Sequence, residues 1–414
     1  MRLSHKVEIQ PTPTQRQAFL QHAGNARWAY NWGLAQHKSA YAAWVKAGKP
    51  KGWDWPTAIG LHKELNALKK KSPEEGGVSW MYEASKCAPQ EALRNLDRAF
   101  KHFFRRCRNG NKRPGFPRFK SRHRGIGGFR LTGVIKADEK TVTLPVIGRV
   151  RIKPGDHGYL RFGRYSQVTV TERAGRWFVS IVGPEIEDGA PNGGPSVGID
   201  VGVARLVTLS DGTIVENPRA LRSSQRKLRR CHKDLSRKKK GSANRNKARL
   251  RLARVFARVA NLRSDALHKA TTLIAKRYGR CCIEDLKVAN MTRSGGSRKR
   301  GLNRVVLDAS FGEFRRMLEY KGRLYGCEVV AVPAQYTSQR CSVCGHVDAG
   351  NRTSQARFCC LSCGFEANAD LNAAINILVS GSCPETQNAC GEDGPGRAFG
   401  PWTASMKQES AAAI

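Results

Sequence analysis

The feature that most restricts how this chain can fold is a pair of Cys-x-x-Cys motifs toward its C-terminal end. Fifteen residues separate the two motifs, which is the spacing of zinc ribbons. Each motif can direct two thiolates at one ion, and two motifs together complete a tetrahedral site. Because four thiolates leave no coordination position open, we expect one structural rather than catalytic Zn²⁺. Cys359 is the neighbouring alternative, but only Cys360 leaves the correct gap to the last cysteine, so the predicted ligands are Cys341, Cys344, Cys360 and Cys363.

The charge of the chain indicates a polyanionic partner. Its 73 Lys and Arg residues outnumber 33 Asp and Glu residues, which gives a formal net charge of +40. Dense arrays of Lys and Arg bind phosphates with release of counterions, so nucleic acid is the expected partner. An acidic membrane surface is the competing interpretation. The length of 414 residues predicts two or three domains.

The expected location of the chain is the cytoplasm. No run of about 18 apolar residues is present, which predicts that no segment spans a membrane. Residues 1–10 are charged and lack the apolar core of a secretory signal. The odd number of cysteines, 13, and the metal-ligand spacing of four of them fit a reducing compartment.

Half of the net charge lies between residues 219 and 280. This stretch holds 22 Lys or Arg residues and two acidic residues, Asp234 and Asp265. A solvated helix face is the simpler interpretation, but such a face ordinarily mixes both signs of charge. The apolar residues recur at helical spacing, which predicts long basic helices with one apolar stripe formed by Leu250, Val255, Val259, Leu262, Ala266, Leu273 and Ile274.

Four segments precede these helices. Thr14 and Gln17 form a capping-box pattern that predicts a helix start, and the apolar spacing after Pro89 predicts a second helix. Between 141 and 182 the apolar period becomes two, which predicts a small β domain. Between 110 and 130, basic residues beside aromatic rings suit single-stranded nucleic acid, and a plain basic linker is an equally good interpretation. The basic candidates there are Arg118, Lys120 and Arg122, and the rings are Phe116, Phe119 and Phe129.

Three acidic residues lie in or beside predicted strands and helices. Asp200 lies in the apolar first strand of a predicted β-hairpin, Glu284 follows the apolar strand 281–283, and Asp370 lies in the first turn of a predicted helix. A buried carboxylate needs a cation or a metal, which makes Asp200 a candidate ligand. Simpler interpretations are a strand bulge or strand end for Asp200, a common strand-end acid pair for Glu284 with Asp285, and a helix cap for Asp370.

The order of these motifs resembles the TnpB family of transposon-encoded, RNA-guided nucleases, which are similar to type V CRISPR effectors. The resemblance runs almost end to end, from Pro11 to Ile377, and includes Arg27-x-x-Tyr30-Asn31. The motifs that carry it are Gly198-Ile199-Asp200, Ile283-Glu284-Asp285-Leu286, Tyr336-Thr337-Ser338-Gln339 ahead of Cys341, Asn368-Ala369-Asp370-Leu371-Asn372-Ala373-Ala374, and Gly115-Phe116-Pro117-Arg118-Phe119-Lys120.

The resemblance implies a multi-domain α/β and β fold. An RNase H-like (RuvC) nuclease domain is expected at 191–335 and 366–380, with the zinc ribbon inserted at 336–365. A β-barrel wedge domain is expected from 1–15 and 120–190, and a helical recognition domain at 16–119. The tail 381–414 is rich in Gly, Ser, Ala and Pro without periodicity, and we expect it to be disordered.

The resemblance also implies the chemistry and the partners. Asp200, Glu284 and Asp370 are expected to hold two catalytic Mg²⁺ ions, or Mn²⁺ in their place, because ions roughly 4 Å apart require clustered carboxylates. The expected partners are a guide RNA from the transposon end and double-stranded target DNA. The basic helices 219–280 are expected to line the channel for the RNA–DNA heteroduplex. We expect a monomer.

Two other functions deserve comparison with an RNA-guided DNA endonuclease. A role in transposition fits a transposon-encoded chain, but the ten histidines include no pair two residues apart, so the His-x-His metal site of single-strand transposases is missing. A guide-dependent DNA-binding regulator without cleavage would require a broken acidic triad. All three positions are carboxylates, which favours the endonuclease.

Overall fold

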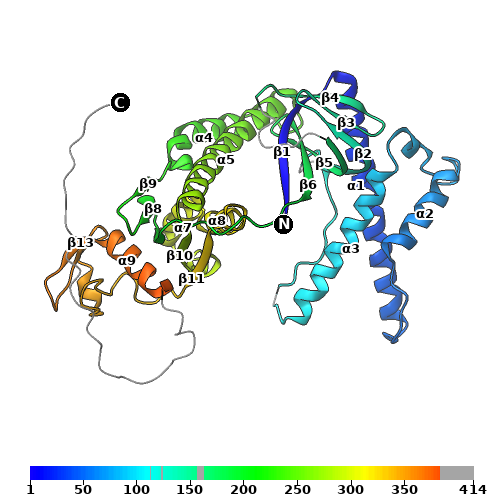
Figure 1. Ribbon diagram of the computed structural model, residues 1–414. Coiled ribbons are helices and arrows are strands. Elements are labelled where there is room, and N and C mark those ends of the chain that lie inside the picture. Colours follow the sequence, from blue (N-terminus) through cyan, green and yellow to red (C-terminus); the bar gives the residue numbers. More distant parts are fainter. Residues whose placement is uncertain (112, 123–124, 156–162, 383–414) are drawn as a thin grey trace.

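The computed structural model describes residues 1–111, 113–122, 125–155 and 163–382. It consists of a β-barrel with attached helices and of a five-stranded sheet covered by helices, with a long basic helix running between them (Figure 1). The disorder predicted for the tail falls outside the described residues, except that Gly381 and Ser382 belong to the last helix. None of the described helices combines the length and the apolar character that a membrane crossing requires.

The barrel confirms the two-residue apolar period. Its strands follow one another in the order β1-β4-β3-β2-β5-β6 and close on themselves, and the apolar side chains predicted to alternate between 142 and 181 are buried. Ala174 and Gly175 both have positive φ angles, which suits the two-residue turn between the last two strands. The strands are β1 (Arg2–Gln10), β2 (Gly128–Ala137), β3 (Thr141–Leu144), β4 (Gly148–Ile152), β5 (Gly163–Arg173) and β6 (Arg176–Glu185).

Helices pack directly on this barrel: α1 (Pro13–Lys46), α2 (Ala58–Lys70), the short helix η1 (Ser79–Glu83) and α3 (Cys87–Arg108). Phe19 of α1 contacts Trp177 of the barrel, with ring centroids 4.9 Å apart, so both parts share one apolar core. The predicted capping box is wrong by two residues, because Thr12 and Gln15 form it instead. Pro13 then occupies the first helical turn, where its missing N–H costs nothing.

The second unit is a three-layer arrangement around a sheet with the strand order β11-β10-β7-β8-β9. Strands β7, β10 and β11 are parallel, whereas β8 and β9 are antiparallel to their neighbours. Val197, Ile199, Cys281 and Ile283 face α5 and α8, while the alternate residue Cys282 packs with Ile377 of α9 on the other face. The elements are β7 (Ser196–Val201), β8 (Arg205–Leu209), β9 (Ile214–Glu216), β10 (Arg280–Glu284), β11 (Glu328–Val332), α8 (Phe311–Tyr325) and α9 (Ala369–Ser382).

The basic segment forms long helices as predicted, α4 (Ala220–Ser236) and α5 (Ala243–Arg277). Its single apolar stripe was wrong in part, since Leu262 and Leu273 are exposed. The reason is that α5 has two partners: its first half packs on α4 through Leu252 and Val255, and its second half packs on the sheet. The remaining elements are α6 (Val288–Met291), α7 (Ser297–Ala309), η3 (Ala349–Asn351), β12 (Arg357–Cys359) and β13 (Glu366–Asn368).

Helix α9 lies unusually close to the sheet. A Cβ atom on Gly198 of β7 would stand 1.9 Å from the carbonyl oxygen of Ala374, and one on Gly381 would stand 2.2 Å from Sγ of Cys282. Only glycine allows the backbones of a helix and a strand to approach in this way. The contact therefore fixes where the first turn of α9 lies above β7.

Gly198→Ala should destabilise the protein by ~3 kcal/mol or more, because the new Cβ meets helix backbone that has no room to yield. Gly193→Ala is the matched control, since a Cβ there meets no atom within 4 Å. Urea denaturation of both variants measures the difference. Equal midpoints for the two variants would show that α9 can move off the strand without cost.

Candidate metal centres and nucleic-acid surface

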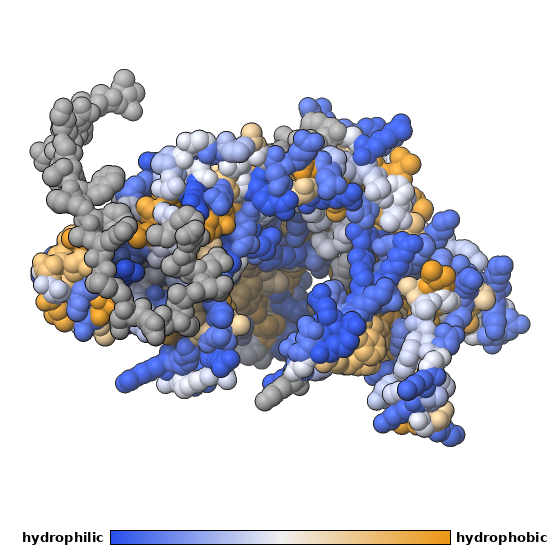
Figure 2. Space-filling view, turned by 60° about the horizontal axis from the view of Figure 1, so that its bottom comes forward, coloured by the Kyte–Doolittle hydropathy of each residue, from blue (hydrophilic) through white to orange (hydrophobic). Residues whose placement is uncertain are grey.

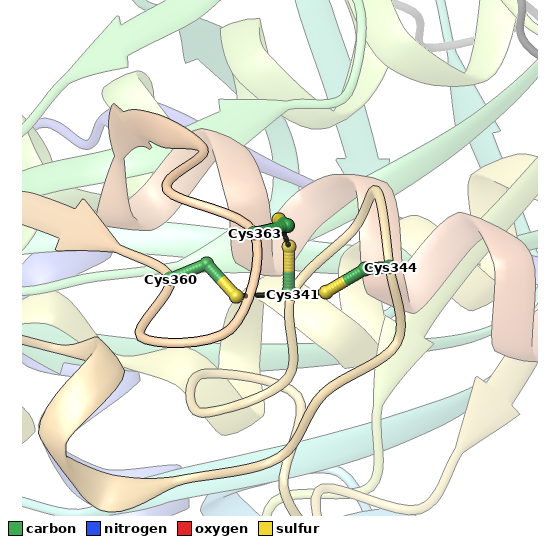
Figure 3. Close-up of side chains that lie close together, drawn as sticks. All are labelled: Cys341, Cys344, Cys360 and Cys363. Atoms are coloured by element: carbon green, nitrogen blue, oxygen red, sulfur yellow. Dashed lines mark hydrogen bonds between the residues drawn. The ribbon is translucent and has the colours of Figure 1, made fainter.

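The four predicted zinc ligands converge on one point (Figure 3). Sγ of Cys341 lies 3.8 Å from Sγ of Cys363, and Sγ of Cys344 lies 3.5 Å from Sγ of Cys360. Zn–S bonds of about 2.3 Å at tetrahedral angles place sulfur atoms about 3.8 Å apart, so the cluster fits Zn²⁺. Cys359 belongs to β12 and is not a member of the cluster, as its position in the sequence predicted.

The two knuckles repeat the same backbone geometry. In each, the carbonyl of the first cysteine accepts from the glycine four residues later, at 3.0 Å. Gly345 and Gly364 have φ angles of 78° and 73°, the left-handed conformation that glycine adopts without strain. Asn351 is fully buried between the knuckles, where its amide donates to the carbonyl of His346 and accepts from the N–H of Leu361. Backbone hydrogen bonds therefore pre-shape the site for the metal.

The structure brings Asp200, Glu284 and Asp370 to one place. Ile199 and Ile283 are paired across the parallel strands β7 and β10, so the acids that follow them lie side by side. Asp370 occupies the first turn of α9, one turn before the close contact at Gly198. Among the described residues, the four cysteines form a group whose ligand atoms all lie within 4.8 Å of one another, and the three acids do not form a second such group.

The environment of Asp200 disfavours its ionised form. Burial, and then the charges of Glu284 and Asp370, raise its pKa from 3.8 to about 7, although the nearby Arg352 acts in the opposite direction. Asp200 pairs regularly with Thr208 of β8, which contradicts the interpretation of a strand bulge. Keeping the three acids together therefore lowers the stability of the folded protein.

Glu284 and Asp285 have different surroundings. Burial raises the pKa of Glu284, and one of its oxygens, Oε1, accepts a hydrogen bond from the hydroxyl of Thr337. The side chain of Asp285 is exposed and pairs with Arg315, which lowers its pKa. The pair is therefore not a simple strand-end acid pair, because only Glu284 faces the other two acids.

Asp370 is not the cap of α9. The side chain of Asn368 accepts from the N–H of Asp370 at 3.0 Å and thereby fills that role. The carboxylate of Asp370 lies 3.7 Å from the guanidinium of Arg352, which comes from the loop between the two zinc knuckles.

Several polar groups around the acids escaped sequence reasoning. The predicted stripe of α9, formed by positions 371, 374, 375 and 378, is only partly correct, because Asn372 and Asn376 are more deeply buried than Leu371 and Ile375. Their spacing of four residues was the available signal, since it places both amides on one helix face. No sequence pattern indicated that Arg352 and Thr337 would lie beside the acids.

Two of the three predicted nucleic-acid contacts meet on one surface. Arg118 and Lys120 line a hollow of about 380 Å³ together with Arg27, whereas Arg122 is not among its lining residues. The side chain of Asn31 pairs with both backbone groups of Lys120, at 2.8 and 2.9 Å, so this segment is docked on α1. The predicted aromatic partner Phe129 was wrong, because it is buried in the barrel core.

An adjacent hollow of about 610 Å³ shares Arg27 and was missed in the sequence. Its aromatic lining consists of Trp28, Trp32 and Trp80, and the exposed fraction of Trp80 is 45%. Hydrophilic side chains cover much of the face seen in Figure 2, and this face is hollowed between the half that holds α9 and the half that holds α3. Rings beside cationic groups are suited to stacking bases and pairing phosphates.

We expect about one zinc per chain by elemental analysis. Cys341→Ser should lose the zinc and lower the melting temperature, because three thiolates hold the ion less well and the ribbon has little other core. Cys359→Ser should keep both. Loss of zinc in Cys359→Ser alone would contradict the ligand assignment.

The raised pKa of Asp200 makes stability depend on pH in a defined direction. A carboxyl whose pKa is higher in the folded state than in the unfolded state reduces stability as the pH rises from about 4 to about 7, and the loss persists above that. In EDTA, Asp200→Asn should therefore be more stable than the wild type at pH 8, by on the order of 2–4 kcal/mol.

The two proteins should converge as the pH falls below about 4, because Asp200 then becomes protonated in both states. Asp285→Asn is the control of opposite sign, because its carboxylate is stabilised in the folded state by Arg315. Urea titrations across this pH range measure both effects. A stability gain that does not change with pH would mean that Asp200 does not titrate in this range.

Comparison with known proteins places these sites in context. Family models match residues 168–295 (probable transposase), 311–377 (Cas12f1-like, TNB domain) and 1–45 (helix-turn-helix domain). Residues 1–45 nevertheless form β1 and most of the single helix α1. A solved Cas12f1–sgRNA–target DNA complex is similar with a TM-score of 0.48 and 16% identity, covering 91% of this chain and 98% of that one.

Two sequence relatives are similar over most of their length. The putative RNA-guided DNA endonuclease InsQ of Escherichia coli K12 is 36% identical over 405 residues, which cover 94% of this chain and 93% of that protein. A putative RNA-guided DNA endonuclease of Streptomyces pristinaespiralis is 36% identical, covering 78% of this chain and 77% of that protein. Identity at this level over nearly the whole chain agrees with the order of its motifs, and the chain belongs to the TnpB family.

Proposed function

We propose that this chain is an RNA-guided DNA endonuclease encoded by a transposon. Its catalytic site, formed by Asp200, Glu284 and Asp370, hydrolyses phosphodiester bonds of the target DNA. The observation that carries this proposal is the meeting of three carboxylates from β7, β10 and α9 at one place. In the part of the chain that the structure describes, neither Asp200 nor Glu284 forms an ion pair. The names of both relatives agree with this activity.

The donor set fits hard divalent cations. Mg²⁺ prefers carboxylate oxygens, and buried acids without cationic partners gain most from an ion. Asp200 and Glu284 lie on neighbouring strands, which are about 4.8 Å apart in any sheet, so the backbone ladder fixes the spacing of two ligands. When bound, two Mg²⁺ ions, or Mn²⁺, would supply an activated water and stabilise the leaving oxygen.

The domain assignment is part of the proposal. We assign 1–15 and 120–190 to a wedge domain, 16–119 to a recognition domain, 191–335 and 366–380 to a RuvC domain, and 336–365 to a ribbon that holds one structural Zn²⁺. The closed barrel, the helices α1 to α3 and the five-stranded sheet support these assignments. The wedge and recognition domains are not separated by a gap in packing, because the barrel and the helices share one apolar core.

The proposed nucleic-acid partners are a guide RNA from the transposon end and double-stranded DNA, bound by one copy of the chain. Helices α4 and α5 present exposed arginines toward solvent, including Arg251, Arg254 and Arg258, which suit the backbone of an RNA–DNA heteroduplex. Arg118 and Lys120 would contact phosphates beside Arg27, and Arg122 would extend this surface. The hollowed face in Figure 2 supports this placement.

The test is cleavage of matched and mismatched DNA duplexes by the protein copurified with RNA from its native locus. Cleavage should require Mg²⁺, disappear when the RNA is stripped, return when it is restored, and fail on mismatches next to the flanking motif. Cleavage of the matched duplex by RNA-free protein would indicate a non-specific nuclease. Guide-dependent binding without cleavage by the wild type would indicate a regulator.

Alanine at Asp200, Glu284 or Asp370 should reduce cleavage by ~10³-fold or more, while target binding largely survives, because these acids hold ions rather than nucleic acid. The losses should not add in double variants. Asp285→Asn is the matched control: it removes a neighbouring carboxylate that is exposed and paired with Arg315, and its cleavage rate should stay near that of the wild type. Equal losses in Asp285→Asn and Glu284→Ala would contradict the assigned triad.

A further inference from the structure

The segment that enters the zinc ribbon is attached to the acidic site as well as to the metal. It begins after β11 and turns at Tyr336, whose φ angle of 61° is left-handed and whose carbonyl accepts from the N–H groups of Gln339 and Arg340, both at 2.9 Å. Thr337 lies within this turn and is 5% exposed. A buried hydroxyl at a strained turn needs a partner, and Thr337 donates to a carboxylate oxygen of Glu284 and, at the longer distance of 3.5 Å, to the carbonyl of Ala334.

Two asparagines of α9 hold this turn in place. Asn376 donates to the carbonyls of Thr337 and Arg340 at 2.9 and 2.7 Å. Asn372 donates to the carbonyl of Arg340 at 2.8 Å and accepts from the N–H of Ser342 at 2.9 Å. Both side chains are buried, with Asn376 5% and Asn372 0% exposed, so these bonds are shielded from competing water. The turn therefore moves with α9, the helix that carries Asp370.

The hydroxyl of Thr337 is the only hydrogen-bond donor to the Glu284 side chain within the described ranges. It binds Oε1 and leaves Oε2 without a protein partner there. A side chain with several rotatable bonds would otherwise occupy several rotamers in this space. One bond from a fixed hydroxyl restricts the carboxylate and orients the second oxygen.

We propose that Thr337 is a positioning residue for Glu284, through which the zinc ribbon and α9 set the geometry of the nuclease metal site. This inference rests on the proposed function, because it takes Glu284 to be a ligand of the catalytic ions. Groups that hydrogen-bond to metal ligands typically contribute 10- to 100-fold to metal affinity. Thr337 is therefore expected to act on divalent-ion binding and not on nucleic-acid binding.

The experiment compares Thr337→Val, which keeps the shape but removes the hydroxyl, with Thr337→Ser, which keeps the hydroxyl. Binding of Mn²⁺ to the full-length, zinc-loaded chain freed of nucleic acid is measured by electron paramagnetic resonance. We expect Thr337→Val to bind Mn²⁺ about tenfold more weakly and Thr337→Ser to bind it nearly as the wild type does. The zinc content of both variants should equal that of the wild type.

Thr353→Val is the matched control, because Thr353 is an exposed ribbon threonine whose hydroxyl donates to the carbonyl of Arg357 at 3.2 Å and not to a carboxylate. It should bind Mn²⁺ as the wild type does. Unchanged Mn²⁺ affinity in Thr337→Val would overturn the inference, as would equal losses in the Val and Ser variants or loss of zinc together with Mn²⁺. If Asp200→Ala fails to reduce Mn²⁺ binding by the wild-type chain, the proposed metal site itself is wrong, and the inference falls with it.

Discussion

The close packing of α9 on β7 and β10 determines the position of nearly every group at the acidic site. Because Gly198 and Gly381 have no side chains, the helix backbone rests directly on the strands. This contact places Asp370 beside Asp200, and it aligns Asn372 and Asn376 with the turn that enters the zinc ribbon. Side chains at these two positions would hold the helix away from the strands and separate these groups.

The acidic site is kept at the expense of stability. Burying Asp200 and Glu284 near a third acid disfavours their ionised forms, as the raised pKa values of both residues show. Such an arrangement persists where surrounding structure enforces it, and here a parallel strand pair and a close-packed helix do so. A divalent cation would attract all three carboxylates and so offset their mutual repulsion. Acids that are held together at such an electrostatic cost therefore indicate a functional site.

The zinc ribbon is joined to this site by more than the covalent chain. Arg352 from between the knuckles faces Asp370, Thr337 from the entry turn faces Glu284, and β13 leads directly into α9. A structural metal held by the four cysteines would therefore stabilise a segment that reaches two of the three acids. Half of the net positive charge of the chain lies between residues 219 and 280, which include α4 and α5 between the sheet and the barrel, where a polyanion would contact both units.

Local sequence determined the features that depend on spacing along the chain. The cysteine motifs specified the metal cluster, because each knuckle is closed by bonds within a few residues. The apolar periods identified the barrel strands β3 to β6, the basic helices and the strands that carry Asp200 and Glu284, since burial on one face requires those periods, but they did not identify β1 and β2. The order of the motifs also indicated the family, and the family resemblance predicted the acidic triad. Tertiary structure alone decided which of two interpretations the neighbouring acids Glu284 and Asp285 take: it paired Asp285 with Arg315 and joined Thr337 to Glu284. These contacts connect residues or faces that no periodicity relates, so only the folded chain could bring them together.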